Sequence, residues 1–159
     1  MKPSAEKSTF FTEAISPNKE VLEILRQAQL PTADIVNNLN LLGMREAGRL
    51  VGVVGIEVYG RVGMLRSLAV VSGRRKRGLG VCLVSDAETW AVKHGIRTLY
   101  LLTKTAEGFF AKLGYEAVPR SEAPAAIAAT AQFSALCPAS STLMRKELAP
   151  NHWPKGQRP

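Results

Sequence analysis

The sequence predicts one domain of the α+β class. Its 159 residues are a usual length for a single domain, and 46% of them are hydrophobic, which is enough for a core. Strand-like segments dominate the first half, and helical segments alternate with strands in the second half. We therefore expect residues 1–150 to form one domain and the proline-rich residues 151–159 to form a loose tail.

Turn and cap residues divide the first half into its elements. Ser16 and Pro17 suit the start of a helix, and Pro31 would end it. Apolar, β-branched residues around short turns at 46–48 and 60–63 indicate strands. The elements expected here are a strand at 8–15, a helix at 16–31, a short helix at 32–40, two strands flanking residues 46–48, and a strand at 62–71.

Helical periodicity and glycines divide the second half. After Gly78, apolar residues recur at the spacing of one helix face, and Gly95 is a natural terminator. Gly114 would close a second helix in the same way. The elements expected here are a helix from Gly78 to Gly95, a strand at 96–103, a helix at 105–114, a strand from Tyr115, an alanine-rich helix at 121–136, and a strand at 140–148.

The charge balance indicates an anionic partner. The chain has 21 Lys and Arg against 13 Asp and Glu, a formal net charge of +8. Such a balance suits nucleic acid, a membrane surface or a phosphate-bearing small molecule. An aromatic content of 6% argues against single-stranded nucleic acid, which needs stacking platforms.

Cysteine and histidine are too sparse for a zinc site, so we expect no metal. Cys82 and Cys137 are expected to pack as small hydrophobic residues, with a thiol near the cofactor or at the acceptor site as the alternative. The sequence contains no apolar run near ~20 residues and no signal-peptide pattern. We therefore expect a cytoplasmic protein.

A basic, glycine-rich turn precedes the long helix. Residues 74–77 are four consecutive cations, and Gly78 and Gly80 follow them. The first amides of a helix carry partial positive charge, and glycine lets a ligand approach the backbone closely. This turn therefore predicts an anion site. Neither a Walker loop nor a dinucleotide fingerprint fits the spacing, whereas Arg75-x-x-Gly78-x-Gly80 does.

That spacing resembles the signature of the GNAT superfamily of N-acetyltransferases, Gln/Arg-x-x-Gly-x-Gly/Ala after a Leu-Ala-Val-like strand end. The strand end here is Leu68-Ala69-Val70, and residues 109–115, "FFAKLGY", echo a second block of the family. The resemblance implies a central, twisted, mixed but mostly antiparallel sheet of six to seven strands flanked by helices. It also implies acetyl-coenzyme A as the co-substrate.

By resemblance, the cofactor would be held by the backbone of the turn, the backbone of the strand end before it, and the Phe110 ring. The pyrophosphate would sit on the turn amides and the pantetheine arm would pair with the end of the preceding strand. Phe110 stands where the family commonly has a Tyr that protonates the leaving thiolate, so no donor is expected there; Tyr100 and Tyr115 are weak alternatives. The implied cofactor residues are Leu68, Ala69, Val70, Arg75, Lys76, Arg77, Gly78, Leu79, Gly80 and Phe110.

Acetyl transfer by direct attack needs a neutral amine and stabilisation of the developing charge. The best acid near the strand before the signature is Glu57. If the 60–63 connection is tight, Glu57 lies across from Arg66 on one face. Glu57 would then be the base, with Arg66 anchoring an anionic group of the acceptor. The equally weighted alternative is a cross-strand salt bridge without a catalytic role.

The acceptor is suggested only by further resemblances. Residues 99–115 are similar to the acetyltransferase domain of N-acetylglutamate synthase, and blocks at 50–60, 64–70, 98–103, 109–114 and 129–141 are similar to small GNAT proteins of bacterial arsenic-resistance operons. These imply detoxification by acetylation of a small amino-acid-like amine, with Arg66, Thr103 and Ser140 in the acceptor pocket.

Other functions stay open at this point. An inactive coenzyme A-binding protein is one, because of Phe110. A protein or peptide acetyltransferase is another. A nucleic-acid-binding module is disfavoured because the cations cluster at one turn. We expect no nucleic-acid or membrane partner, and a homodimer is possible.

Overall fold

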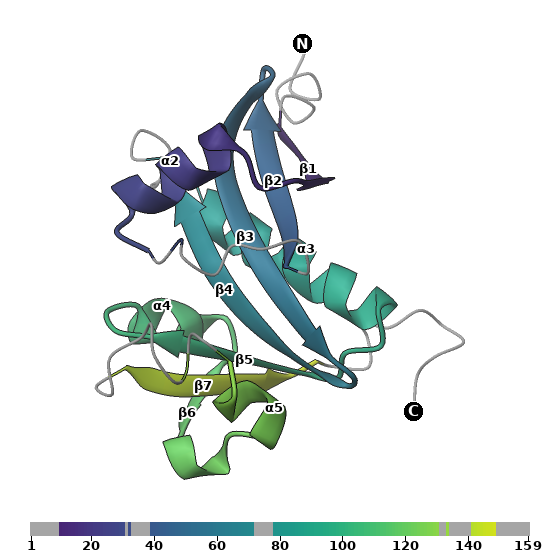
Figure 1. The fold of residues 1–159 in the computed structure, drawn as a ribbon, viewed down its shortest axis with the longest axis vertical. Coiled ribbons are helices and arrows are strands. Elements are labelled where there is room, and N and C mark those ends of the chain that lie inside the picture. The colour runs from purple at the N-terminus through teal and green to yellow at the C-terminus, as the bar shows by residue number, and fades with distance from the viewer. Residues whose placement is uncertain are drawn as a thin grey trace. The chain divides into compact units, whose positions relative to one another are not determined.

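The structure is a computed structural model, and it describes residues 10–30, 32, 39–71, 78–130, 133 and 141–148. Seven strands form a single mixed sheet in the order β1-β2-β3-β4-β5-β7-β6 (Figure 1). The predicted α+β fold with a sheet of six to seven strands is confirmed. The strands are β1 (Phe10–Ile15), β2 (Asn40–Glu46), β3 (Arg49–Tyr59), β4 (Val62–Val70), β5 (Thr98–Thr103), β6 (Glu116–Val118) and β7 (Thr142–Glu147).

The sheet is mostly antiparallel. β1 with β2, β2 with β3, β5 with β7 and β6 with β7 are antiparallel, and β4 with β5 is parallel. Parallel strands need a crossover, and α3 lies between them in the chain. The helical segments are α2 (Lys19–Gln27), α3 (Leu79–Lys93), α4 (Glu107–Lys112), α5 (Ala125–Ala128) and the short 3₁₀ turn η2 (Arg120–Glu122).

The chain divides into two compact units. The first comprises Met1–Ile56 and Ser67–Ala87, and the second comprises Glu57–Arg66 and Glu88–Pro159. The boundary falls within β3, β4 and α3, so each of these elements contributes residues to both units.

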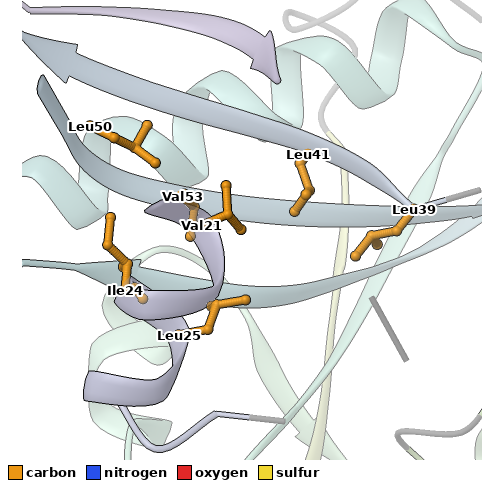
Figure 2. Close-up of a cluster of buried hydrophobic side chains, with 8 residues drawn as sticks. Val21, Ile24, Leu25, Leu39, Leu41, Leu50 and Val53 are labelled. Carbon is orange, nitrogen blue, oxygen red and sulfur yellow. The ribbon is translucent and has the colours of Figure 1, made fainter. Parts of the chain in front are cut away.

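The first unit has a core between α2 and the strands β2 and β3 (Figure 2). Val21, Ile24 and Leu25 lie at helical spacing on one face of α2 and are buried. They pack with Leu39, Leu41, Leu50, Val53 and Ala69. Gly43 of β2 is needed under this cluster, because an added Cβ would lie 2.6 Å from Ile15 Cδ1 and 2.8 Å from Leu50 Cδ1.

In the same unit, the first turns of α3 pack against β3. Leu83 of α3 is fully buried, and a Cβ added at Gly52 of β3 would lie 2.7 Å from its Cδ1. A glycine in the strand therefore lets the helix approach closely.

The predicted turn between β2 and β3 is confirmed, with Ala47 at φ 51° and Gly48 at φ 83°.

The second unit has its own core on the face of β4, β5 and β7. Met64, Tyr100, Ile127 and Leu143 form a buried cluster. Partly buried hydrophobic residues surround it: Tyr59, Val62, Leu102, Val118, Ala123 and Phe133. Ile127 belongs to α5, so this short helix contributes to the cover of the cluster.

Two predicted helices differ from the structure. The first helix is capped by Asn18 rather than Ser16, because Asn18 Oδ1 accepts the Val21 amide at 3.0 Å and the helix begins at Lys19. In the alanine-rich segment, α5 spans only four residues; Thr130 Oγ1 donates to the Ile127 carbonyl at 2.8 Å just after it ends. Asn40 lies in β2, and residues 33–38 of the predicted second helix are outside the described residues.

Candidate functional site

In the first unit, the end of β4 leads to the start of α3. Ala69 is buried in the core cluster, while Leu68 and Val70 are half-buried. The buried Leu79 anchors the start of α3. Arg75, Lys76 and Arg77 of the predicted cofactor site lie outside the described residues.

The start of α3 has the backbone that an anion site requires. Gly78 is exposed with φ at 75°, and nothing lies within 4 Å of an added Cβ. Cys82 N donates to the Gly78 carbonyl at 3.2 Å, so the amides of Leu79, Gly80 and Val81 precede the first donor of the helical ladder. The first turn of α3 has no acidic residue. These features fit a diphosphate.

Ser67 interrupts β4 between the predicted acceptor and cofactor residues. Its φ is 58°, a left-handed value that is rare for a residue with a side chain, and the residue is buried. Such a conformation costs on the order of 1–3 kcal/mol and clusters at functional sites. Sequence reasoning missed this feature, because serine in an apolar strand gives no signal for a positive φ.

In the second unit, Glu57 of β3 and Arg66 of β4 form the expected ion pair. Arg66 Nη1 donates to Glu57 Oε2 at 2.8 Å. The Arg66 side chain is 1% exposed, whereas the Glu57 side chain is 16% exposed. The strands are joined by a two-residue turn, Gly60–Arg61. An anionic acceptor would therefore have to share a buried guanidinium with Glu57.

Tyr59 completes this cluster, and sequence reasoning missed it. Its hydroxyl donates to Glu57 Oε1, the carboxylate oxygen that does not face Arg66 Nη1. Glu57 and Tyr59 are two residues apart on β3, and alternate residues of a strand share a face. That i, i+2 spacing was the available signal. We call Glu57, Tyr59 and Arg66 the Glu57 cluster.

A second carboxylate in this unit has similar partners. Tyr115 Oη donates to Glu88 Oε2 at 2.9 Å, and Lys146 Nζ lies 3.0 Å from Glu88 Oε1. Lys146 Nζ also donates to the Leu113 carbonyl at 2.8 Å, just after α4 ends. The Glu88 side chain is 4% exposed. We call Glu88, Tyr115 and Lys146 the Glu88 cluster.

Neither alternative tyrosine is suited to protonate a thiolate. Burial, together with the negative charge and the hydrogen bond of Glu88, raises the pKa of Tyr115 far above its usual value. Tyr100 is buried opposite Arg145 in the β5–β7 register. A hydrogen bond between the Tyr100 and Arg145 side chains raises the pKa of Arg145. The Tyr115 proton is thus committed to a carboxylate, and Tyr100 is buried where its oxygen accepts from a guanidinium.

Two further predicted site residues are Phe110, which lies in α4, and Thr103, which ends the strand before it. Phe110 is buried, and its ring meets that of Tyr115 edge-on at 5.6 Å between centroids. Thr103, at the end of β5, is half-buried, and its Oγ1 accepts the Ala106 amide at 2.9 Å. Ser140 of the predicted acceptor pocket lies outside the described residues.

Cys82 is exposed on α3, so the prediction that it packs in the interior is wrong. Cys82 follows Val81, which is also exposed, in the first turn of the helix. Cys137 lies outside the described residues. Among the described residues, no group of three or more His, Cys, Asp or Glu is placed to hold a metal ion. The described helices include none with the length and hydropathy of a membrane span.

The comparisons with known proteins define the class. The model of the acetyltransferase (GNAT) family matches residues 8–115. The chain belongs to this family. It is 32% identical over 78 residues to an uncharacterised N-acetyltransferase of Chlorobaculum tepidum, which is 48% of this chain and 50% of that protein. The match thus spans about half the length of this curated relative.

Two solved structures share the fold. N-acetylglutamate synthase from Neisseria gonorrhoeae, complexed with coenzyme A and N-acetyl-glutamate, superposes with a TM-score of 0.73 at 15% identity, over 87% of this chain and 35% of that one. A putative acyl-CoA N-acyltransferase from Klebsiella pneumoniae gives 0.70 at 19% identity, over 89% and 99%.

Proposed function

We propose that the protein is an N-acetyltransferase that moves an acetyl group from acetyl-coenzyme A to the amine of a small, amino-acid-like acceptor. The observation that carries this proposal is the start of α3, where Gly78 at φ 75° precedes helix amides with no acidic residue in the first turn. Family membership supports it, and so does the relative described as an N-acetyltransferase.

The co-substrate would be held by its diphosphate and its pantetheine arm. The diphosphate would bind the amides from Arg75 to Gly80, with the cations of the turn adding to the field. The arm would pair with the backbone of Leu68–Val70 as an added strand. Phe110 would supply an apolar contact rather than a proton.

Glu57 would act as the base of the reaction. Acetyl transfer by direct attack requires the amine nitrogen to lose its proton first, and a carboxylate held within reach of the amine can accept it. Glu57 is the partly exposed acid of its cluster. No acyl-enzyme is required, so the exposed thiol of Cys82 has no role in this scheme.

The acceptor would carry an anionic group as well as an amine. Arg66, Thr103 and Ser140 are the residues we assign to it, and Arg66, whose side chain is 1% exposed beside Glu57, would have to turn toward the acceptor. A carboxylate, phosphinate or arsinate would suit a guanidinium, which binds such groups in a bidentate manner. Detoxification of an arsenical or a related toxic amino-acid analogue in the cytoplasm is the corresponding role, and a homodimer is compatible with it.

A turnover screen tests this function. The purified protein would be incubated with acetyl-coenzyme A and a panel of amino acids, their phosphinate analogues and their arsenical analogues, and thiol release would be followed. We expect turnover with one anionic amino-acid analogue and none with random DNA or a histone-like peptide. Binding of coenzyme A without turnover on any amine would contradict the proposal.

Binding of coenzyme A without turnover would favour a second candidate function, a coenzyme A-binding protein without catalytic activity. The specific observation for this candidate is the absence of a hydroxyl at Phe110, combined with the engagement of Tyr115 by Glu88. A thiolate can nevertheless leave without a dedicated donor, because a thiol with a pKa of about 8.5 is acidic enough for its anion to be a good leaving group.

A further inference from the structure

The second unit contains two networks of the same chemistry. In each, a tyrosine hydroxyl donates to a carboxylate that also pairs with a cation, and the three groups come from different positions along the chain. The members are Tyr59, Glu57 and Arg66 in the Glu57 cluster, and Tyr115, Glu88 and Lys146 in the Glu88 cluster.

The two networks differ in their access to solvent. In the Glu88 cluster, both Glu88 and Tyr115 are buried. In the Glu57 cluster, Glu57 is 16% exposed and Tyr59 is half-buried, whereas Arg66 is closed off. Solvent therefore reaches part of the tyrosine and carboxylate of the Glu57 cluster, whereas those of the Glu88 cluster are almost closed to it.

Both oxygens of the Glu57 carboxylate already hold a partner. Arg66 occupies Oε2 and Tyr59 occupies Oε1. Arg66 cannot pass a proton on, because a guanidinium stays protonated at any working pH. A phenol, by contrast, has one proton to donate and lone pairs with which to accept another. Within the cluster, Tyr59 is the group that can both receive a proton and hand one to Glu57.

We propose that Tyr59 is a further catalytic residue, which relays a proton from the acceptor ammonium to Glu57. This inference rests on the proposed function and adds the path that the proton takes to the base. Tyr59 packs against the buried cluster of Met64, Tyr100, Ile127 and Leu143, which limits the movement of its ring.

The proton transfers balance as follows. An N–H proton of the ammonium passes to the Tyr59 oxygen while the Tyr59 proton passes to Glu57 Oε1, which leaves a neutral amine, a neutral phenol and a neutral carboxylic acid. The nitrogen lone pair then forms the N–C bond, and the C–S bond breaks with its electron pair going to sulfur. The second N–H proton neutralises the thiolate, and Glu57 releases its proton to water.

The test compares Tyr59→Phe with Tyr115→Phe. The two changes are matched, since each removes a hydroxyl that donates to a cation-paired glutamate. The acceptor is the methylphosphinate analogue of L-glutamate, and a second acceptor carries an aminooxy group in place of the amine, so that its nitrogen is already neutral at pH 7. Coenzyme A binding by calorimetry serves as the readout of folding.

For Tyr59→Phe we expect kcat to fall about 100-fold on the amine, with coenzyme A affinity unchanged. The loss should shrink to a few-fold on the aminooxy acceptor, which needs no deprotonation. Glu57→Gln should show the same split, and the double variant should be no slower than either single variant. Tyr115→Phe should keep its kcat on both acceptors.

Two results would overturn the relay. One is an unchanged kcat for Tyr59→Phe on the amine. The other is an equal loss on both acceptors, which would indicate a structural role for the hydroxyl. If the wild-type protein binds coenzyme A but acetylates neither acceptor and no other amine of the screening panel, then the proposed function itself is wrong and the relay with it, so the two failures are distinguishable.

Discussion

Arg66 donates to Glu57 across 2.8 Å from a position where only 1% of its side chain is exposed, while its partner is 16% exposed. Removing one member of this pair therefore has a different consequence for each remaining charge. Without Glu57, a buried guanidinium loses the carboxylate with which it pairs. Without Arg66, a carboxylate remains that water can still reach.

This asymmetry predicts the order of two stability changes. Glu57→Leu should lower the free energy of unfolding by about 3–5 kcal/mol, the usual cost of stranding a buried charge. Arg66→Met should cost less than Glu57→Leu, because Glu57 keeps part of its hydration. Urea unfolding of both variants measures the difference, and a larger loss for Arg66→Met would contradict the explanation.

The buried Glu88–Lys146 pair predicts that substitutions at these two residues have strongly non-additive effects on stability. Lys146→Met alone should lower the free energy of unfolding by about 3–5 kcal/mol, because it removes one member of a buried ion pair. Adding Glu88→Leu should recover much of the loss, since a buried pair can be replaced by apolar groups. Arg26→Ala is the control: the Arg26–Glu23 pair is exposed, and its loss should cost about 0.5 kcal/mol or less. Additive effects at Glu88 and Lys146 would refute the coupling.

Tyr115 predicts a pH dependence of stability. Its pKa is raised in the folded protein, so the unfolded chain loses the phenol proton first, near pH 10. The stabilisation is complete below that pH and is lost as the pH rises further, by up to about 1.4 kcal/mol per pH unit. Between pH 9 and 11.5, the free energy of unfolding should fall less steeply with pH for Tyr115→Phe than for the wild-type protein. Parallel curves would exclude this role.

Two glycines predict substitutions of opposite sign. Gly63→Ala should destabilise the protein by about 1–3 kcal/mol, because the new methyl group would lie 3.1 Å from the Glu57 carbonyl oxygen and 2.8 Å from Ile96 Cδ1. Gly108→Ala in α4 should stabilise it by about 0.5–1 kcal/mol, since nothing lies within 4 Å of the added Cβ and alanine favours a helix. Thermal unfolding of both variants checks the signs.

Local signals allowed most of the fold to be predicted. Gly48, Gly78, Gly95 and Gly114 all have a positive φ, and each was predicted to lie at a turn or a helix end. The cap at Asn18 was missed because Ser16 two residues earlier is an equally good cap by type. The continuous helix predicted at 121–136 is interrupted within the described residues, because η2 and α5 are separate and Thr130 bonds back to Ile127, which propensity alone does not show.

The candidate site was predictable only where neighbours in the chain form it. The start of α3 is such a place, because its glycines, cations and strand end are contiguous. The Glu57–Arg66 pair also followed from a short hairpin. The contact of Tyr115 with Glu88 joins residues 27 positions apart, and no local pattern indicates it.

The central claim is that backbone amides after Gly78 bind the diphosphate of coenzyme A, and calorimetry tests it most directly. Coenzyme A should bind the wild-type protein at least about tenfold more tightly than pantetheine, which lacks the diphosphate and the adenosine 3′-phosphate attached to it. Gly78→Val, which imposes a side chain on a φ of 75°, should weaken coenzyme A and leave pantetheine unchanged. Equal affinities for the two ligands, or no heat with millimolar coenzyme A, would contradict the account.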